Sequence, residues 1–356
     1  MTAQSTFLLA KQTPGRRLLV VCAMLAAFLL LAVMIAVASG PAPIPYQAVP
    51  GIVLHGLGAP LDPAVPASQV TIVHQVRLPR VLASMLIGAA MAVSGAVMQG
   101  IFRNPLADPG ILGVSAGGAT GAVIAFASGA ALAGIWVVPL FAFVGSLLAA
   151  MIVYLLSLER GRTQTTSLLL GGTALNAFLT AIISAVLLAI DEAAESQLVM
   201  SWLVGGLAGR GWRHLLTIIA PTLIGIALLY SYSRDLNLFL LGEDTAQGLG
   251  TNVPRTRFIL IGLTALITGV SVSIAGPIGF IGLIVPHVLR LIIGPDHRVL
   301  LPASALGGAL LLVVADTLAR LVIPYQEMPV GIITGLIGGP FFLFLLWRLR
   351  RNARLL

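Results

Sequence analysis

The sequence predicts an all-α integral membrane protein whose single polytopic domain, residues 1–356, crosses the bilayer ten times. Hydrophobic residues make up 58% of the chain and charged residues 9%, whereas a soluble domain carries about 25% charged residues. The mean hydropathy is +1.04, and apolar runs long enough to span a bilayer follow one another with short breaks. The expected spans are residues 18–39, 81–102, 111–128, 135–158, 165–190, 214–232, 258–275, 283–293, 299–318 and 330–347.

The first span follows a polar segment that ends in Arg16 and Arg17. A secretory signal peptide has an apolar core of about 7–15 residues. The run 18–39 is longer, although small residues at its end would suit cleavage. We therefore expect an uncleaved helix that enters from the cytoplasm. Residues 40–76 are rich in proline and only mildly polar, which predicts an external segment with short helices at most.

Helix breakers and charged turns separate the next spans. The segment Arg77–Arg80 begins the second span, and residues 103–109 end it on the inside, because a regular helix cannot continue through two prolines. A charged turn at residues 159–162 and an acidic loop at residues 191–195 flank the fifth span. Residues 205–213 form a glycine-rich external turn before the sixth span.

The third span carries a stripe of small residues. Gly113, Gly117 and Gly121 recur at intervals of four, and small residues at that spacing let another helix approach closely in a membrane. We therefore expect this stripe to be a helix-packing face.

The C-terminal half contains a polar segment of about twenty residues, 238–257, which we expect to form a rigid, capped loop on the cytoplasmic side. Acidic residues suit the positive N-terminal end of a helix, and glycine suits the left-handed turn after it. Such a loop is suited to binding another protein. The residues that build it are Gly242, Glu243 and Asp244 at its opening, Ala246 and Leu249 on a small apolar face, and Gly250 at its end.

The last four spans follow this loop. A glycine- and proline-rich break at residues 276–282 precedes a short returning helix. Residues 296–298 lie inside, residues 320–329 lie outside, and the basic tail beyond residue 347 ends inside. With this topology both termini are cytoplasmic.

Basic residues support this orientation. Fifteen of the twenty Lys and Arg residues fall in segments assigned to the cytoplasm and five fall outside, as the positive-inside rule predicts. The five exceptions are Arg77, Arg80, Arg210, Arg213 and Arg320.

The residues that are missing argue against several chemistries. A nucleotide-binding loop needs Gly-Lys-Ser or Gly-Lys-Thr, but the only lysine is Lys11. The acids lie in loops or near helix ends, whereas a proton-coupled carrier usually has ionisable residues deep in its helices. The single Cys22 permits no internal disulfide and no metal cluster. The basic clusters lie beside apolar runs and aromatic residues are few, which argues against nucleic acid as a partner.

Five motifs, in order and with matching spacing, resemble the permease subunits of type II ABC importers, which take up iron-siderophore chelates, haem and cobalamin in bacteria. The resemblance covers essentially the whole chain. The motifs are Arg77–Arg80, Gln99 to Gly113 through Asn104-Pro105-Leu106-Ala107, Leu241 to Gly250, Gly276 to His287, and Gly331 to Pro340.

The resemblance implies a homodimer of ten-helix subunits in the bacterial inner membrane. Two cytoplasmic ATPases would carry ATP and magnesium, and an external substrate-binding protein would deliver the chelate. The permease itself would be non-catalytic and would bind no cofactor or metal. The loop matching Gly242–Gly250 would couple to the ATPase, and the helix 165–190 with its dimer mate would line the path.

The resemblance also assigns roles to individual residues. Arg77, Arg80 and Arg320 would dock acidic residues of the binding protein, although arginines at such depths are commonly lipid anchors. The roles of Arg210 and Arg213 stay open between these two. Asn104, Leu106 and Thr163 match a cytoplasmic gate; without the resemblance, an Asn-Pro helix stop explains the first two equally well.

Three functions therefore remain. An iron chelate, either a ferric siderophore or haem, is the expected substrate, because such systems are the more numerous. Cobalamin is the alternative within the class, and nothing in the chain separates the two. A proton-coupled secondary transporter is the alternative from another class, and it predicts transport by this chain without an ATPase.

Overall fold

The computed structural model describes residues 14–159, 162–163, 165–190, 193–323 and 327–353. Apart from the two-residue strands β1 (Leu158–Glu159) and β2 (Arg162–Thr163), paired antiparallel, the regular structure is helical, which confirms the predicted class. In the described part, seven helices are long and apolar enough to cross a membrane, and three apolar helices are shorter. The ten helices at the predicted spans are α2 (Pro14–Ala38), α5 (Leu78–Phe102), α6 (Val114–Ala127), α7 (Val137–Leu156), α8 (Thr165–Leu188), α10 (Trp212–Ser231), α13 (Val253–Ala275), α14 (Ile281–Ile293), α15 (His297–Leu321) and α16 (Val330–Ala353).

The second span begins earlier than the sequence predicts. A continuous helical segment runs from α4 (Ala67–Thr71) through the π-helical turn Ile72–Arg77 into α5. Pro79 lacks an N–H and would disturb a regular helix here, and the wider π-helical turn directly before it accommodates the disturbance. The two arginines of this motif, Arg77 and Arg80, therefore lie within the helical segment and not before it.

A short helix, α9 (Ala193–Val204), occupies a region for which the sequence predicted only the acidic loop 191–195. Its apolar side includes the buried residues Val199 and Trp202. The loop prediction missed α9 because a twelve-residue helix is too short to give a span signal. The remaining short elements are α3 (Ala48–His55), η2 (Pro109–Leu112), η3 (Ala130–Ala133), α11 (Ser233–Leu240) and α12 (Glu243–Gly248).

Helix α5 is the centre of the bundle, and α14 and α15 pack on it at glycines. A Cβ at Gly88 would meet the Gly308 carbonyl oxygen of α15, and a Cβ at Gly308 would meet the Gly88 oxygen in return. A Cβ at Gly95 would meet the Gly282 carbonyl oxygen of α14. Because the backbones touch at these points, α5, α14 and α15 form one closely packed block.

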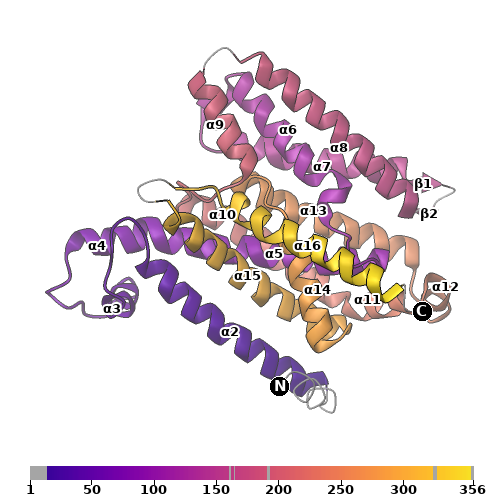
Figure 1. Cartoon of the computed structure of the whole chain (residues 1–356), viewed down its shortest axis with the longest axis horizontal. Coiled ribbons are helices and arrows are strands. Elements are labelled where there is room, and N and C mark those ends of the chain that lie inside the picture. Colours follow the sequence, from indigo (N-terminus) through magenta and orange to yellow (C-terminus); the bar gives the residue numbers. More distant parts are fainter. Residues whose placement is uncertain (1–13, 160–161, 164, 191–192, 324–326, 354–356) are drawn as a thin grey trace.

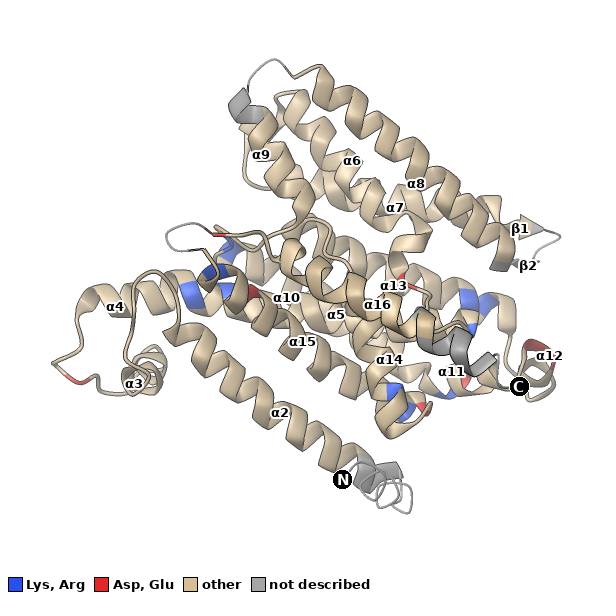
Figure 2. Ribbon diagram, in the orientation of Figure 1, with Lys and Arg blue, Asp and Glu red and all other residues tan. Residues whose placement is uncertain are grey.

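Helices α6 to α9 form a second group on one side of this block, and α2 lies on the opposite side (Figure 1). Charged residues gather at the two ends of the bundle and are scarce between them (Figure 2). We call the end where α4 leads into α5 and where α15 ends, which holds Arg77, Arg80 and Arg320, the arginine end. The end that holds α11 and α12 is the loop end.

Candidate functional site

The loop end carries two short helices, α11 and α12, joined at Gly242. Gly242 has φ +108° and Gly250 has φ +93°, values that residues with a Cβ rarely adopt. Glu243 and Asp244 occupy the first turn of α12, where acids suit the helix dipole. The short helix therefore lies between the two glycines that the sequence indicated.

Polar contacts fix this loop to itself and to α13. Arg257, which is buried in α13, forms an ion pair with Glu243 of α12. Thr251 donates its hydroxyl proton to Asp235 of α11 at 3.1 Å, and its N–H binds the Ala246 carbonyl oxygen at 3.0 Å. These bonds make residues 233–251, which we call the α11–α12 knob, a folded element whose shape is set before any partner binds.

Ala246 and Leu249 do not form one exposed apolar face, contrary to the sequence prediction, because only Leu249 is exposed. Ala246 is fully buried against the helix bundle, whereas Leu249 is 57% exposed. Leu241, which lies between α11 and α12, is 62% exposed, and Asp244, which lies between Leu241 and Leu249 in the sequence, is also exposed. The knob therefore presents two leucines and an acidic side chain to its surroundings.

A buried ionic cluster lies at the arginine end. Arg80 of α5 forms a bidentate contact with the Asp316 carboxylate of α15, at 3.0 and 3.1 Å, and a second ion pair with Glu327 at 2.8 Å. Arg320 approaches the same Asp316 carboxylate at 3.2 Å. The single negative charge of Asp316 therefore faces the positive charges of two guanidinium groups in a site shielded from solvent.

Arg77 and Arg320 also bind the C-terminal end of α2. Arg77 donates to the carbonyl oxygens of Val37 at 2.8 Å and Ala38 at 2.6 Å, and also to that of Ala42. Arg320 donates to the oxygens of Ala36 and Ser39 at 3.1 and 3.0 Å. The last carbonyl groups of a helix have no partner within it and carry its negative dipole end, so two guanidinium groups satisfy them.

These contacts correct the interpretation of the three arginines as docking charges. Arg77, Arg80 and Arg320 are only 4%, 5% and 6% exposed, so none of them is a surface charge or a lipid anchor in this subunit. Sequence reasoning gave Asp316 and Glu327 no role, although the Asp316–Arg320 spacing of four on one helix suggests an ion pair.

Arg210 lies beside this cluster, in a pocket of about 300 Å³ between α9 and the segment Glu327–Pro329. Its Nε has no hydrogen-bond partner among the described residues, and burial lowers the pKa of its guanidinium group. Arg213, at the start of α10, is exposed. The two arginines whose roles the sequence left open are thus in different environments.

The three gate residues lie in the segments that precede α6 and α8. The Asn104 side chain accepts the Leu106 N–H at 3.0 Å, a turn that stops α5 after the left-handed Arg103. Thr163 is in β2, and its side chain lies outside the described residues. The Asn-Pro helix stop is therefore present in the structure, and a gating role stays a prediction.

Nearby, Asp108 caps η2 by accepting the Gly110 N–H at 2.8 Å. Burial raises the pKa of the Asp108 carboxyl group, and this hydrogen bond opposes the shift.

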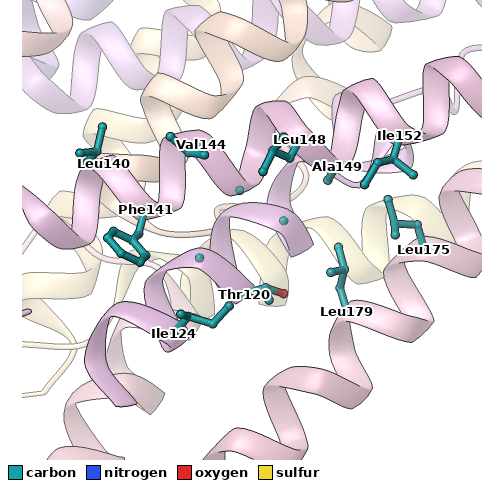
Figure 3. Close-up of a pocket in the computed structure, with 13 residues that line it drawn as sticks. Thr120, Ile124, Leu140, Phe141, Val144, Leu148, Ala149, Ile152, Leu175 and Leu179 are labelled. Atoms are coloured by element: carbon teal, nitrogen blue, oxygen red, sulfur yellow. The ribbon is translucent and has the colours of Figure 1, made fainter. Parts of the chain in front are cut away.

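The glycine stripe divides between two roles. Cβ atoms at Gly117 and Gly121 would meet the carbonyl oxygens of Gly145 and Phe141, so α6 lies directly against the backbone of α7 there. Gly113, with φ +77°, is instead the left-handed residue between η2 and α6. A cavity of about 440 Å³ opens beside this contact between α6, α7 and α8; its lining is almost wholly apolar (Figure 3).

No group of three or more His, Cys, Asp or Glu side chains able to hold a metal occurs within the described ranges.

A solved structure, described as an inward-facing conformation of a metal-chelate type ABC transporter, matches with a TM-score of 0.78 and 33% identity over 92% of this chain and 98% of that chain.

Sequence relatives agree with this structural match. The cobalamin import system permease protein BtuC of Halobacterium salinarum is 47% identical over 81% of this chain and 76% of its own length. The hemin transport system permease protein HmuU of Yersinia pestis is 45% identical over 78% of this chain and 83% of its own. A sequence model of the FecCD transport family matches residues 25–348. The chain therefore belongs to the FecCD transport family and is a multi-pass permease of the ABC-importer type.

Proposed function

We propose that this chain is the non-catalytic permease subunit of an ATP-driven importer that carries an iron chelate, a ferric siderophore or haem, across the bacterial inner membrane. The observation that supports this most directly is the α11–α12 knob. It is a preformed surface element with exposed Leu241, Asp244 and Leu249, in a chain without the Gly-Lys-Ser or Gly-Lys-Thr of a nucleotide site.

In this proposal the permease works as a homodimer with two ATPase subunits, which hold ATP and magnesium. The knob is cytoplasmic and fits a groove of the ATPase, and both termini lie on that side. The path runs between α8 and its dimer mate, and Asn104, Leu106 and Thr163 close it at the cytoplasmic end.

The binding protein would dock at the arginine end, but not directly on Arg77, Arg80 and Arg320. Glu327, whose side chain is 41% exposed, and Arg213 offer surface charges there. The buried arginines hold the shape of the surface by joining α2, α5 and α15. Exposed charges at a protein interface mainly set the association rate and orientation.

Cobalamin as substrate is equally supported, because one relative is named for cobalamin and another for hemin. The test is uptake by proteoliposomes that contain the permease, its ATPase partner and the binding protein. ATP-dependent uptake of haem or a ferric siderophore would support the proposal, and uptake of cobalamin alone would select the alternative. Uptake driven by a pH gradient without the ATPase would contradict the importer class.

A further inference from the structure

A polar contact joins the knob to the start of α15. The Asn237 side chain of α11 donates from Nδ2 to the Asp296 carboxylate at 2.7 Å. Its Oδ1 accepts the His297 backbone N–H at 2.8 Å and lies 2.9 Å from His297 Nδ1. A carboxylate can only accept hydrogen bonds and a backbone N–H can only donate, so the amide of Asn237 has one orientation that satisfies both.

The residues that receive this contact are themselves fixed. Asp296 caps α15 by accepting the Arg298 N–H at 3.0 Å. His297 is fully buried, and a Cβ at Gly100 of α5 would lie 2.7 Å from its Nε2. Asn237 therefore links α11 to the place where α15 begins and where α15 meets α5.

Apolar packing alone would hold α11 less specifically. Leu236 and Phe239 of α11 are buried in the same apolar cluster as Leu301 of α15. Contacts of this kind are not directional, whereas the hydrogen bonds of Asn237 require defined distances and angles. A displacement of α11 must therefore move the start of α15 or break these bonds.

Helix α15 continues from this contact to the arginine end. Its 25 residues, at about 1.5 Å each, span roughly 38 Å. Asp316 and Arg320 near its far end hold Arg80 of α5 and the end of α2. The Gly88–Gly308 contact keeps α5 and α15 together between the two ends.

We propose that Asn237 is a positioning residue that transmits movement of the α11–α12 knob to α15, and through α15 to the arginine end. The inference rests on the proposed function, in which an ATPase moves the knob. Asn237 contacts neither nucleotide nor substrate in this account. Its loss uncouples ATP hydrolysis from transport, and it leaves assembly with the ATPase intact.

The experiment compares Asn237→Ala with wild type in the complete reconstituted complex. The readouts are ATPase assembly, hydrolysis stimulated by the loaded binding protein, and substrate transported per ATP. We expect assembly to survive and transport per ATP to fall about 2- to 30-fold, the range reported for mutations in coupling elements. Ser231→Ala is the matched control, because its hydroxyl binds Leu228 of its own helix at 2.7 Å; it should couple like wild type.

A double variant that exchanges the amide and the carboxylate of residues 237 and 296 distinguishes a positioning role of Asn237 from a general loss of structure. Asn237→Asp alone places two carboxylates against each other and should uncouple. Adding Asp296→Asn restores a donor for the new carboxylate, and asparagine caps helices as well as aspartate does. Recovery of transport per ATP in the pair, even if Asn237→Ala does not fold, supports the proposal; a pair no better than Asn237→Asp overturns it.

The wild-type complex separates failure of the proposed function from failure of the role of Asn237. If the wild-type complex shows no stimulated hydrolysis and no ATP-dependent transport, the proposed function fails. If wild type couples and Asn237→Ala couples equally well, only the role of Asn237 is overturned.

Discussion

At the scale of single residues, the charge balance of the arginine end depends on Asp316. Its carboxylate is 2% exposed and pairs with Arg80 and Arg320, and Arg77 lies on the same end of α2 as Arg320. Glu327 compensates Arg80 from a more exposed position. Removing a partner from a buried ion pair leaves an uncompensated charge, which costs more than the pair itself gains.

Asp316→Ala should therefore destabilise the subunit by about 3–5 kcal/mol, because Arg80 and Arg320 lose the carboxylate they share. Thermal unfolding of the purified protein in detergent measures the effect. Arg213→Ala, a change of an exposed charge at the same end, should leave the unfolding temperature unchanged. An Asp316→Ala variant as stable as wild type would show that other groups compensate the charges of Arg80 and Arg320.

The two acids of the knob should respond differently to charge reversal. Glu243 is paired with Arg257, so reversing it also breaks an internal ion pair, whereas Asp244→Lys changes an exposed charge and disturbs the helix dipole by only about 0.3–1 kcal/mol. We expect Asp244→Lys to keep its stability and to lose ATPase binding, measured by co-purification. Asp62→Lys is the control, because Asp62 is an exposed acid in the segment between α3 and α4, far from α12 (Figure 1). Normal ATPase binding by Asp244→Lys would mean that the knob is not the contact.

At the scale of elements, closely packed helices meet at glycines, where the backbone of one helix contacts the backbone of the other. Gly117 of α6 and Gly145 of α7 face each other so closely that a Cβ on either would meet the other's carbonyl oxygen. When two packed helices are forced apart in lipid, the packing contacts are lost and no hydrophobic gain compensates for them. The group α6–α9 therefore depends on small residues for its internal packing.

Gly117→Leu should force α6 and α7 apart and lower the unfolding temperature in detergent, with a cost of about 1–3 kcal/mol or more for an overpacked site. Gly262→Leu is the matched control: Gly262 lies within α13, is exposed and has no atom within 4 Å of an added Cβ. Its stability should be unchanged or higher, since leucine favours helix more than glycine does. Equal stability of Gly117→Leu and wild type would contradict the packing.

At the scale of the whole molecule, helices differ greatly in how much of their surface the subunit covers. In the apolar window of α5 together with its preceding turns, 83% of residues are buried, compared with 6% in α8. Among the described residues, the main contacts of α8 are with α6, α7 and η2. A helix so poorly covered in one subunit is well placed to line an interface between two copies, as the proposed homodimer requires.

A cross-linking experiment tests this arrangement. In a Cys22→Ser background, Phe178→Cys on α8 should form a disulfide between two subunits under mild oxidation, detected as a dimer on a non-reducing gel. Leu31→Cys on α2, an exposed residue with similar accessibility, 57% against 62% for Phe178, should stay monomeric. Dimer formation through Leu31→Cys and not through Phe178→Cys would place the interface on α2 instead.

The sequence alone determined the features that depend on local chemistry. A segment in lipid must satisfy its own backbone hydrogen bonds, so hydropathy located the apolar helices. Prolines and glycines located the breaks at residues 103–109 and 276–282. The bounds of α12 also followed from the sequence, because glycine adopts the positive φ found at Gly242 and Gly250 without steric cost. The family could also be recognised, since its motifs are short and ordered along the chain.

Only the tertiary structure decided where charges and contacts lie. Arg80 and Asp316 are 236 positions apart, and the carbonyl groups that bind Arg77 and Arg320 are at the end of another helix. A side chain's partner depends on how helices pack, and helix packing is not encoded in the hydropathy of any one segment. For this reason the sequence placed the three arginines on the surface, and the structure buries them. The Asn237–Asp296 contact likewise exists only because α11 folds back onto the start of α15.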